Sequence, residues 1–158
     1  MILPDGSELP AGDPRLDEFL STRYGDRLRL AEESTVPHHD AAPLHVLTTA
    51  SLHWLQAQLP DSMVDRRRFR PNILLSAAGN GRIEDRWVGQ RFALGGIVLR
   101  IGERTERCVM TTNSQDELPR DPAVLAAVTK MNEVCLGAYA TVERPGTISV
   151  GDSLATLD

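Results

Sequence analysis

Four arginines occupy five consecutive positions, in the run Arg66-Arg67-Arg68-Phe69-Arg70. A guanidinium group carries a permanent charge and a forked set of donors that can bind a phosphate or carboxylate through two hydrogen bonds. If the segment is extended, Arg66, Arg68 and Arg70 share one side of a strand. The residues alone leave two interpretations open, an anion-binding patch and a solvated strand edge guarded by charge.

Cys108 is the second candidate for chemistry, and it lies next to Arg107. A neighbouring guanidinium favours the thiolate, which is the form that binds a metal or carries sulfur. The alternative is an apolar cysteine buried in a strand. Cys135 is expected on the apolar stripe of a helix, where we interpret it as a core residue. The two cysteines form no C-x-x-C pair, which excludes a zinc ribbon and a thioredoxin-type motif.

A third group of polar residues consists of His38, His39, Asp40 and His45. Adjacent residues of a strand point to opposite faces, and no second cluster completes a tetrahedral set of metal ligands. We therefore expect a surface loop here and no metal site.

The elements that must position these residues begin with a helix that Asp13-Pro14 opens and Gly25 ends. Alternating apolar residues predict a strand over 27–31 and another over 44–47. Thr48 or Thr49 can cap a second helix, whose inner face carries Leu52, Leu55 and Leu59. Residues 68–76 are expected to be extended.

Later segments predict mainly strands. A turn at Gly95-Gly96 leads into a strand over 97–101, and a further strand is expected over 107–112. A third helix opens at Asp121-Pro122, with Val124, Val128, Met131 and Cys135 on one stripe. The end of the chain predicts a strand over 138–142, a type II turn at Pro145-Gly146, a strand over 147–150 and a last short strand.

This pattern predicts a mainly β fold with flanking helices, of the α+β class. We expect a partly or fully closed, mostly antiparallel β-barrel without parallel βαβ units, because the helices do not alternate regularly with the strands. The side chains expected to point into the barrel are Ile73, Leu75, Ile97, Leu99, Ile101 and Val109, with Leu52 and Leu55 packed against it.

Composition narrows the class of protein. The 158 residues, 41% apolar and 25% charged, fit one globular domain, and the net charge of −5 argues against nucleic-acid binding. The apolar runs are too short to cross a bilayer and the N-terminus lacks a signal-peptide pattern, so we expect a cytoplasmic protein. All but one of the 17 lysines and arginines are arginine, so Lys130 alone could bind pyridoxal phosphate, a cofactor that we do not expect.

Several short motifs occur in an order that resembles the MOSC domain, the module named for the C-terminal part of molybdenum cofactor sulfurase. The resemblance is to the branch that includes the mitochondrial amidoxime-reducing component, and it covers about residues 40–154. The motifs that carry it are Pro43 to Leu52, Arg68-Phe69-Arg70-Pro71-Asn72, Glu84-Asp85 with Trp87, Arg107-Cys108 with Thr111-Thr112, Gly137-x-Tyr139, and Pro145-Gly146-Thr147-Ile148 with Val150-Gly151-Asp152.

The resemblance implies a MOSC-type β-barrel that holds a molybdenum pterin cofactor. Cys108 matches the cysteine whose thiolate binds molybdenum, so it is both the implied metal ligand and the implied catalytic residue. A thiolate suits molybdenum, and guanidinium forks suit the cofactor phosphate. The implied cofactor-binding residues are Ser51, Arg68, Arg70, Asn72, Arg107, Cys108 and Tyr139. Because the resemblance assigns them to one cofactor site, we expect Arg70 and Cys108 to face a single concave pocket, with Ser51 on its rim.

The implied function is the reduction of N-hydroxylated small molecules. The electrons are expected to come from a separate protein, because the chain has no flavin, haem or iron–sulfur motif. A cofactor-delivery protein is the other expected partner. Longer members of the family carry an upstream β-rich domain, which we expect to be absent from a chain that is one domain over 1–158.

Two alternatives from other functional classes stay open. One is a sulfur carrier or transferase with a persulfide on Cys108. The other is a cofactor-free binding module of the same fold. The missing upstream domain favours that module, and so does Glu106, whose charge would lie near the phosphate.

Overall fold

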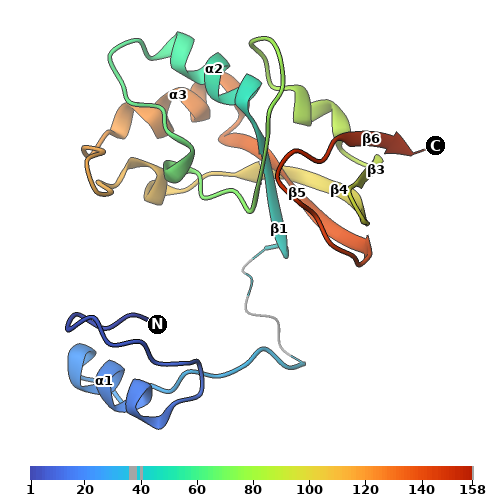
Figure 1. The fold of residues 1–158 in the computed structure, drawn as a ribbon. Helices are drawn as coiled ribbons and strands as arrows, with labels where there is room; N and C mark the ends of the chain where they lie inside the picture. The colour runs from blue at the N-terminus through green and yellow to red at the C-terminus, as the bar shows by residue number, and fades with distance from the viewer. Residues whose placement is uncertain (36–38, 40, 158) are drawn as a thin grey trace. The chain divides into compact units, whose positions relative to one another are not determined.

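A computed structural model describes residues 1–35, 39 and 41–157. The chain divides into two compact units, Met1–Asp40 and Ala41–Asp158, which are described separately below (Figure 1). The expectation of one domain over residues 1–158 stays a prediction.

The first unit is built on helix α1, Pro14–Tyr24, and confirms the helix expected there. Asp13 caps it, its carboxylate accepting the Arg15 backbone N–H at 3.0 Å, and proline follows at the first helical position. Gly25 ends the helix in the left-handed conformation, with φ of 77°, and donates its N–H to the Ser21 carbonyl.

The strand predicted over residues 27–31 is wrong. These residues form no helix and pair with no strand. Instead the Leu28 N–H donates to the Ser21 hydroxyl at 3.0 Å, and the Leu30 N–H donates to the Asp17 carboxylate at 2.9 Å. Side chains of α1 therefore satisfy the backbone groups that a neighbouring strand would have satisfied.

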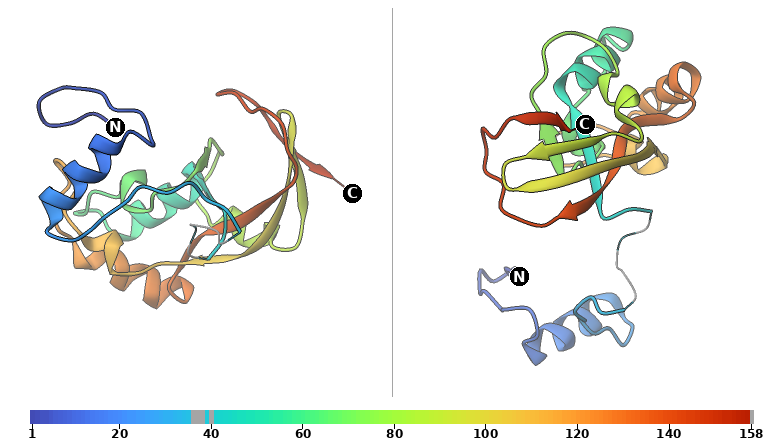
Figure 2. Two further views of the ribbon diagram at one scale, coloured as in Figure 1. Left: turned by 90° about the horizontal axis from the view of Figure 1, so that it is seen from below. Right: turned by 90° about the vertical axis from the view of Figure 1, so that its right-hand side faces the viewer.

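The second unit is a six-stranded sheet with the order β2-β1-β5-β4-β3-β6. The two longest strands, β4 (Ile97–Glu106) and β5 (Cys135–Arg144), pair with each other at the centre, and the curled sheet forms a half-barrel (Figure 2). The outer strands are β1 (Leu44–Thr48), β2 (Ile73–Leu75), β3 (Arg91–Leu94) and β6 (Leu154–Leu157). The mostly antiparallel barrel-like fold predicted from the sequence is confirmed.

One pair of strands departs from the prediction, because β1 and β2 are parallel. The chain passes between them through helix α2, Thr49–Gln58, so a βαβ unit is present, contrary to the expectation. Thr48 caps α2 as expected, its hydroxyl accepting the Ser51 N–H at 3.1 Å. The same hydroxyl donates to the buried carboxylate of Glu84 at 2.9 Å.

The β3–β4 hairpin turns at Gly95-Gly96, as predicted. The segment after β5 does not form the predicted strand over 147–150, and Gly146 lacks the positive φ that a type II turn requires. This segment instead crosses the hairpin closely, and the Gly96 N–H donates to the Thr147 carbonyl at 2.9 Å. A side chain on Gly146 would lie 2.4 Å from the Gly96 carbonyl oxygen.

Apolar side chains pack on both faces of the sheet. One cluster joins the sheet to α2 and to α3, Pro122–Asn132, and contains Leu47, Leu55, Phe69, Val124, Val128 and Leu136. The other face buries Ile97, Leu99 and Ile101, as predicted, with Ile73 and Leu75 packed against them. Burying one large apolar side chain contributes about 1.5–3 kcal/mol, so these clusters fix the arrangement of the strands that carry the candidate site.

Candidate functional site

Cys108 lies just beyond the end of β4, and its side chain is exposed to solvent. The strand expected over 107–112 is wrong, because Val109–Thr112 form the 3₁₀ helix η3. The Thr111 hydroxyl donates back to the Cys108 carbonyl at 2.9 Å, and the Thr112 hydroxyl donates to the Val109 carbonyl at 2.7 Å. Such local bonds from threonine compete with strand pairing. As a result Val109 is 60% exposed and does not point into the barrel, contrary to the prediction.

Arg107 is half-buried beside this thiol. Its Nη2 donates to the Phe69 carbonyl at 2.6 Å, its guanidinium carbon lies 5.7 Å from the centre of the Phe69 ring, and its backbone N–H donates to the Val134 carbonyl. Burial lowers the pKa of the Arg107 guanidinium, while the nearby Tyr139 and Cys108 act in the opposite direction. Its Nε is buried and has no hydrogen-bond partner among the described residues.

The arginine segment is not the extended strand that the sequence predicted. Arg66–Arg68 form the 3₁₀ helix η1, capped by the Asp65 carboxylate, which accepts the Arg67 N–H at 2.8 Å. In this helix the three arginines do not share a side. Asp65 and Glu117 also hydrogen-bond the Arg67 guanidinium and raise its pKa.

Arg68 is buried and hydrogen-bonded within the protein, and its predicted contact with a cofactor stays a prediction. The side chain is 1% exposed, and its guanidinium spans two segments of the second unit. Its N–H groups donate to the backbone carbonyls of Met63, Thr111, Asn113 and Pro119 at 2.8, 3.4, 3.3 and 2.8 Å. A guanidinium so engaged has little donor capacity left for a ligand.

Arg70 is exposed and follows η1 with a φ of 51°, in the left-handed region that non-glycine residues seldom adopt. It lines a cleft of about 440 Å³. The other lining residues are Arg66, Arg67, Pro71, Asn72, Leu74, Gln115 and Asp116. Cys108 does not line this cleft, contrary to the prediction that it shares a pocket with Arg70. Arg70 and Cys108 are instead linked through the bond from Arg107 to Phe69.

Asn72 ties the turn that carries Arg70 to the first strand of the sheet. Its side-chain oxygen accepts the His45 N–H at 2.8 Å, and its own N–H donates to the His45 carbonyl at 2.9 Å. Tyr139 lies opposite His45 in the β1–β5 pairing, and the two rings meet edge to face with their centres 6.5 Å apart. The structure therefore brings Asn72, Tyr139 and the backbone carbonyl of Arg70 together around one histidine, with the charge of Arg107 nearby.

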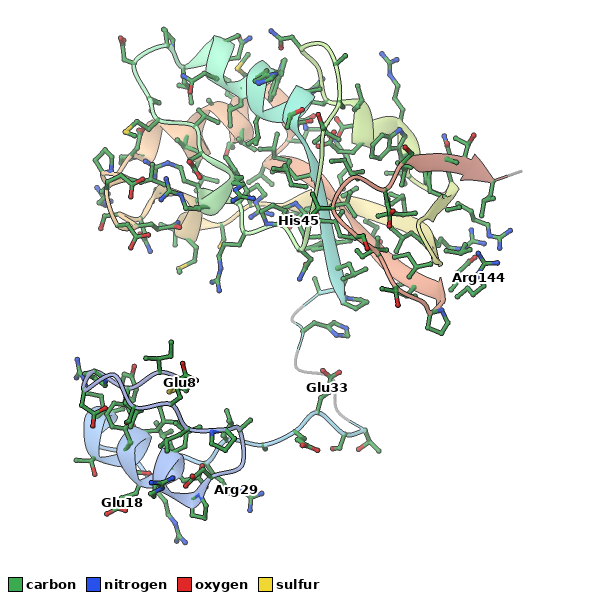
Figure 3. All side chains as sticks on the ribbon, viewed as in Figure 1. Glu8, Glu18, Arg29, Glu33, His45 and Arg144 are labelled. Carbon is green, nitrogen blue, oxygen red and sulfur yellow. The ribbon has the colours of Figure 1, made fainter. Side chains whose placement is uncertain are left out.

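That histidine, His45, was not identified from the sequence as part of the site, and the surface loop expected for it together with His38, His39 and Asp40 is wrong at this residue, because His45 lies in strand β1. It is 7% exposed, lies in the interior of the second unit (Figure 3), and its Nε2 has no partner among the described residues. Burial lowers the pKa of His45 to about 4, helped by the charge of Arg107 and opposed by the nearby carbonyls of Leu136, Arg70 and Phe69. The available signal was a histidine within an apolar strand, Leu44-His45-Val46-Leu47.

Ser51 does not lie on the rim of a pocket, contrary to the prediction. It is fully buried in the first turn of α2, and its hydroxyl donates to the Gly81 carbonyl at 3.4 Å. The position predicted for Cys135 is also wrong, because this residue begins strand β5 and does not lie on the apolar stripe of helix α3. It is buried as expected, and burial raises the pKa of its thiol.

The remaining candidates can be placed only in part. His38 and Asp40 lie outside the described residues. Within residues 1–35, 39 and 41–157, no three histidine, cysteine or acidic side chains gather as a metal site would require. Over the same residues, no helix has the length and apolar character needed to cross a membrane.

Comparisons with known proteins identify the family and the fold. A family model described as the MOSC domain matches residues 33–155. Mitochondrial amidoxime-reducing component 1 of Mus musculus is 32% identical over 135 residues, which are 77% of this chain and 38% of that protein. The Homo sapiens protein of the same name is 28% identical, covering 77% of this chain and 39% of its own length. The chain thus spans less than two thirds of the curated relatives that it matches.

Solved structures show the same fold at low sequence identity. YiiM from Geobacillus stearothermophilus superposes with a TM-score of 0.59 at 14% identity, covering 74% of this chain and 55% of that one. The YUAD protein from Bacillus subtilis gives 0.58 at 17% identity, covering 70% and 61%.

Proposed function

Because the chain belongs to the MOSC domain family, we propose that it binds a molybdenum pterin cofactor beside Cys108, Arg107 and Arg70. The observation that carries the proposal is an exposed thiol next to a half-buried arginine whose Nε donor is unused. An exposed cysteine is available to a metal, and an unsatisfied buried donor favours the arrival of an acceptor.

The residues present fit such a cofactor. A thiolate is a suitable ligand for molybdenum, and guanidinium groups suit a phosphate. Among the described residues no carboxylate lies within salt-bridge distance of Arg66 or Arg70, whereas Arg67 is paired with Asp65 and Glu117. Two exposed positive charges at one cleft are therefore free to bind an anion.

Each residue then has a defined task. Cys108 holds the metal, Arg66 and Arg70 bind the phosphate, and Arg107 donates to an acceptor atom of the cofactor. Asn72 keeps the turn that carries Arg70 in place through its two hydrogen bonds to His45. When bound, the cofactor supplies electron transfer to the substrate.

The proposed substrates are N-hydroxylated small molecules. An amidoxime carries an N–OH group, and the mouse and human relatives are named amidoxime-reducing components. We propose further that the electrons come from a separate donor protein.

Metal analysis tests the role of Cys108. We expect purified or cofactor-loaded protein to contain molybdenum and Cys108→Ser to lose it, because a hydroxyl is a harder and far more basic ligand than a thiolate. Mass spectrometry of the metal content gives the result directly, and Cys135→Ser is the matched control, since that thiol is buried. A wild-type protein without molybdenum that instead gains one sulfur atom on Cys108 from a desulfurase would favour a sulfur carrier.

Two substitutions test the role of Arg70, because its side chain is charged and its backbone has the left-handed conformation. Arg70→Gly removes the guanidinium and suits the backbone, whereas Arg70→Ala removes the guanidinium and keeps the strain. We expect both to weaken cofactor binding by about tenfold or more, as the loss of a charge-assisted hydrogen bond predicts. In chemical denaturation we expect Arg70→Gly to have a higher free energy of unfolding than Arg70→Ala. If both variants bind the cofactor like wild type, the phosphate is held elsewhere.

A further inference from the structure

Two neighbouring side chains of the site each bury a polar atom without a hydrogen-bond partner among the described residues. The atoms are His45 Nε2 and Arg107 Nε. Leaving a buried donor or acceptor unpaired destabilises a folded protein, and native structures do so rarely. Two such atoms at one site therefore require a physical explanation.

The space around His45 Nε2 depends on a glycine in the adjacent strand. Gly137 lies in β5 with a φ of 86°, and a Cβ atom there would come within 2.2 Å of His45 Nε2 and 2.8 Å of the Val46 carbonyl oxygen. Only glycine adopts this backbone conformation without strain and leaves the imidazole its position. The fold thus keeps a histidine with an unpaired nitrogen at position 45, although the apolar side chain of a leucine could have filled the same space.

The two side chains converge on the same backbone segment. Arg107 donates to the Phe69 carbonyl at 2.6 Å, and the His45 imidazole lies near the carbonyls of Phe69 and Arg70. A neutral imidazole carries one N–H and one bare nitrogen, while the Arg107 Nε offers only an N–H. The pair can therefore present a hydrogen-bond donor beside a hydrogen-bond acceptor.

We propose that His45 and Arg107 form a hydrogen-bonding subsite for an amide-type edge of the ligand, a C=O group next to an N–H. This inference rests on the proposed function, because a pterin ring carries such an edge. Arg107 Nε–H donates to the carbonyl oxygen, and the bare nitrogen of His45 accepts from the N–H. The subsite adds His45 and Gly137 to the residues on which cofactor binding depends.

The test compares His45→Leu, which fills the space with apolar atoms, with His45→Gln, whose amide keeps a donor and an acceptor. His53→Leu is the matched control, because His53 is an exposed histidine in α2. Each protein is loaded with the molybdenum pterin cofactor and gel-filtered, and the molybdenum left per chain is measured by mass spectrometry. The thermal unfolding midpoint of each cofactor-free protein is measured in parallel.

We expect His45→Leu to retain up to about tenfold less molybdenum than wild type, the loss that one hydrogen bond predicts. Its cofactor-free form should unfold at the wild-type temperature or above, because the substitution removes a buried unsatisfied nitrogen. His45→Gln should retain clearly more molybdenum than His45→Leu, and His53→Leu should match wild type.

Equal retention by the leucine and glutamine variants, at any level, overturns the inference, and an internal water then explains the two unpaired atoms. Absence of molybdenum from the wild-type protein is a separate result that overturns the proposed function. If His45→Leu does not fold, Arg107→Lys asks the same question. It keeps the charge but has no Nε–H, so retention equal to wild type again overturns the subsite.

Discussion

Arg68 and Arg70 are two positions apart in the same arginine-rich segment, yet the structure uses them in opposite ways. Arg68 is buried and binds four backbone carbonyls, whereas Arg70 is exposed at a cleft. The 3₁₀ helix η1 and the left-handed backbone at Arg70 separate the two side chains. The number of arginines in a segment therefore says little about how many can bind a ligand.

At the same scale, the burial of His45 predicts that the stability of the folded chain depends on pH. Its pKa is about 4 in the folded chain, against an ordinary value of 6.5. Between these two pH values the unfolded chain binds more protons than the folded chain. The contribution of neutral His45 to the free energy of unfolding is therefore fully present above pH 6.5 and is lost as the pH falls toward 4. We expect wild type to lose about 2 kcal/mol of unfolding free energy from this group between pH 7 and pH 5.

Urea denaturation at the two pH values measures this loss. His45→Leu removes the titrating group, so the fall in its unfolding free energy should be smaller by the same amount. His53→Leu is the control and should behave as wild type does. An equal fall in wild type and His45→Leu would show that His45 is not the group responsible.

At the scale of elements, the site depends on an irregularity in the central pair of strands. The β4–β5 register shifts between Arg104 and Glu106, near the left-handed Gly137 of β5. Val134, just before β5, also has a positive φ of 63°, which is strained for a β-branched residue, and its carbonyl accepts the Arg107 N–H. Strain of this kind is often found at functional sites, and here it lies next to the segment that carries Cys108.

A glycine substitution in each central strand tests this dependence. Gly137→Ala forces a Cβ atom into His45 and requires an unfavourable φ, so we expect a loss of about 2–4 kcal/mol in unfolding free energy. Gly102→Ala in β4 is the control, because its Cβ would meet only the Tyr139 carbonyl oxygen at 3.8 Å. Similar stability of the two variants in urea denaturation would contradict the close packing of His45 on Gly137.

At the scale of the molecule, the sheet, its buried clusters and the candidate site are all formed by residues of the second unit. The first unit buries only two large apolar side chains among its described residues, Leu9 and Leu16. Chains of about 40 residues seldom bury enough apolar surface to fold alone.

Separate expression of the two units tests this difference. We expect residues 41–158 to give dispersed amide NMR signals and a cooperative thermal transition. A peptide of residues 1–40 should show little helix by circular dichroism. A second unit that lacks dispersed signals or a cooperative transition would show that its fold requires the first 40 residues.

The sequence by itself determined the features that depend on neighbouring residues. Asp13-Pro14, Thr48 and Asp121-Pro122 begin helices because a cap bonds to N–H groups two or three positions away. Gly95-Gly96 turns a hairpin for an equally local reason. Alternating apolar residues indicated which side chains face the barrel, and the order of the motifs indicated the family, which the comparisons confirm.

Only the tertiary structure decided the roles of Arg68, Ser51, Val109 and His45. Three of the carbonyls that bind Arg68 lie 43 to 51 residues further along the chain, and Gly137 gives His45 its space from a different strand. Burial and hydrogen bonding at these positions depend on which distant segments pack together, and the spacing of residues along one segment carries no information about that.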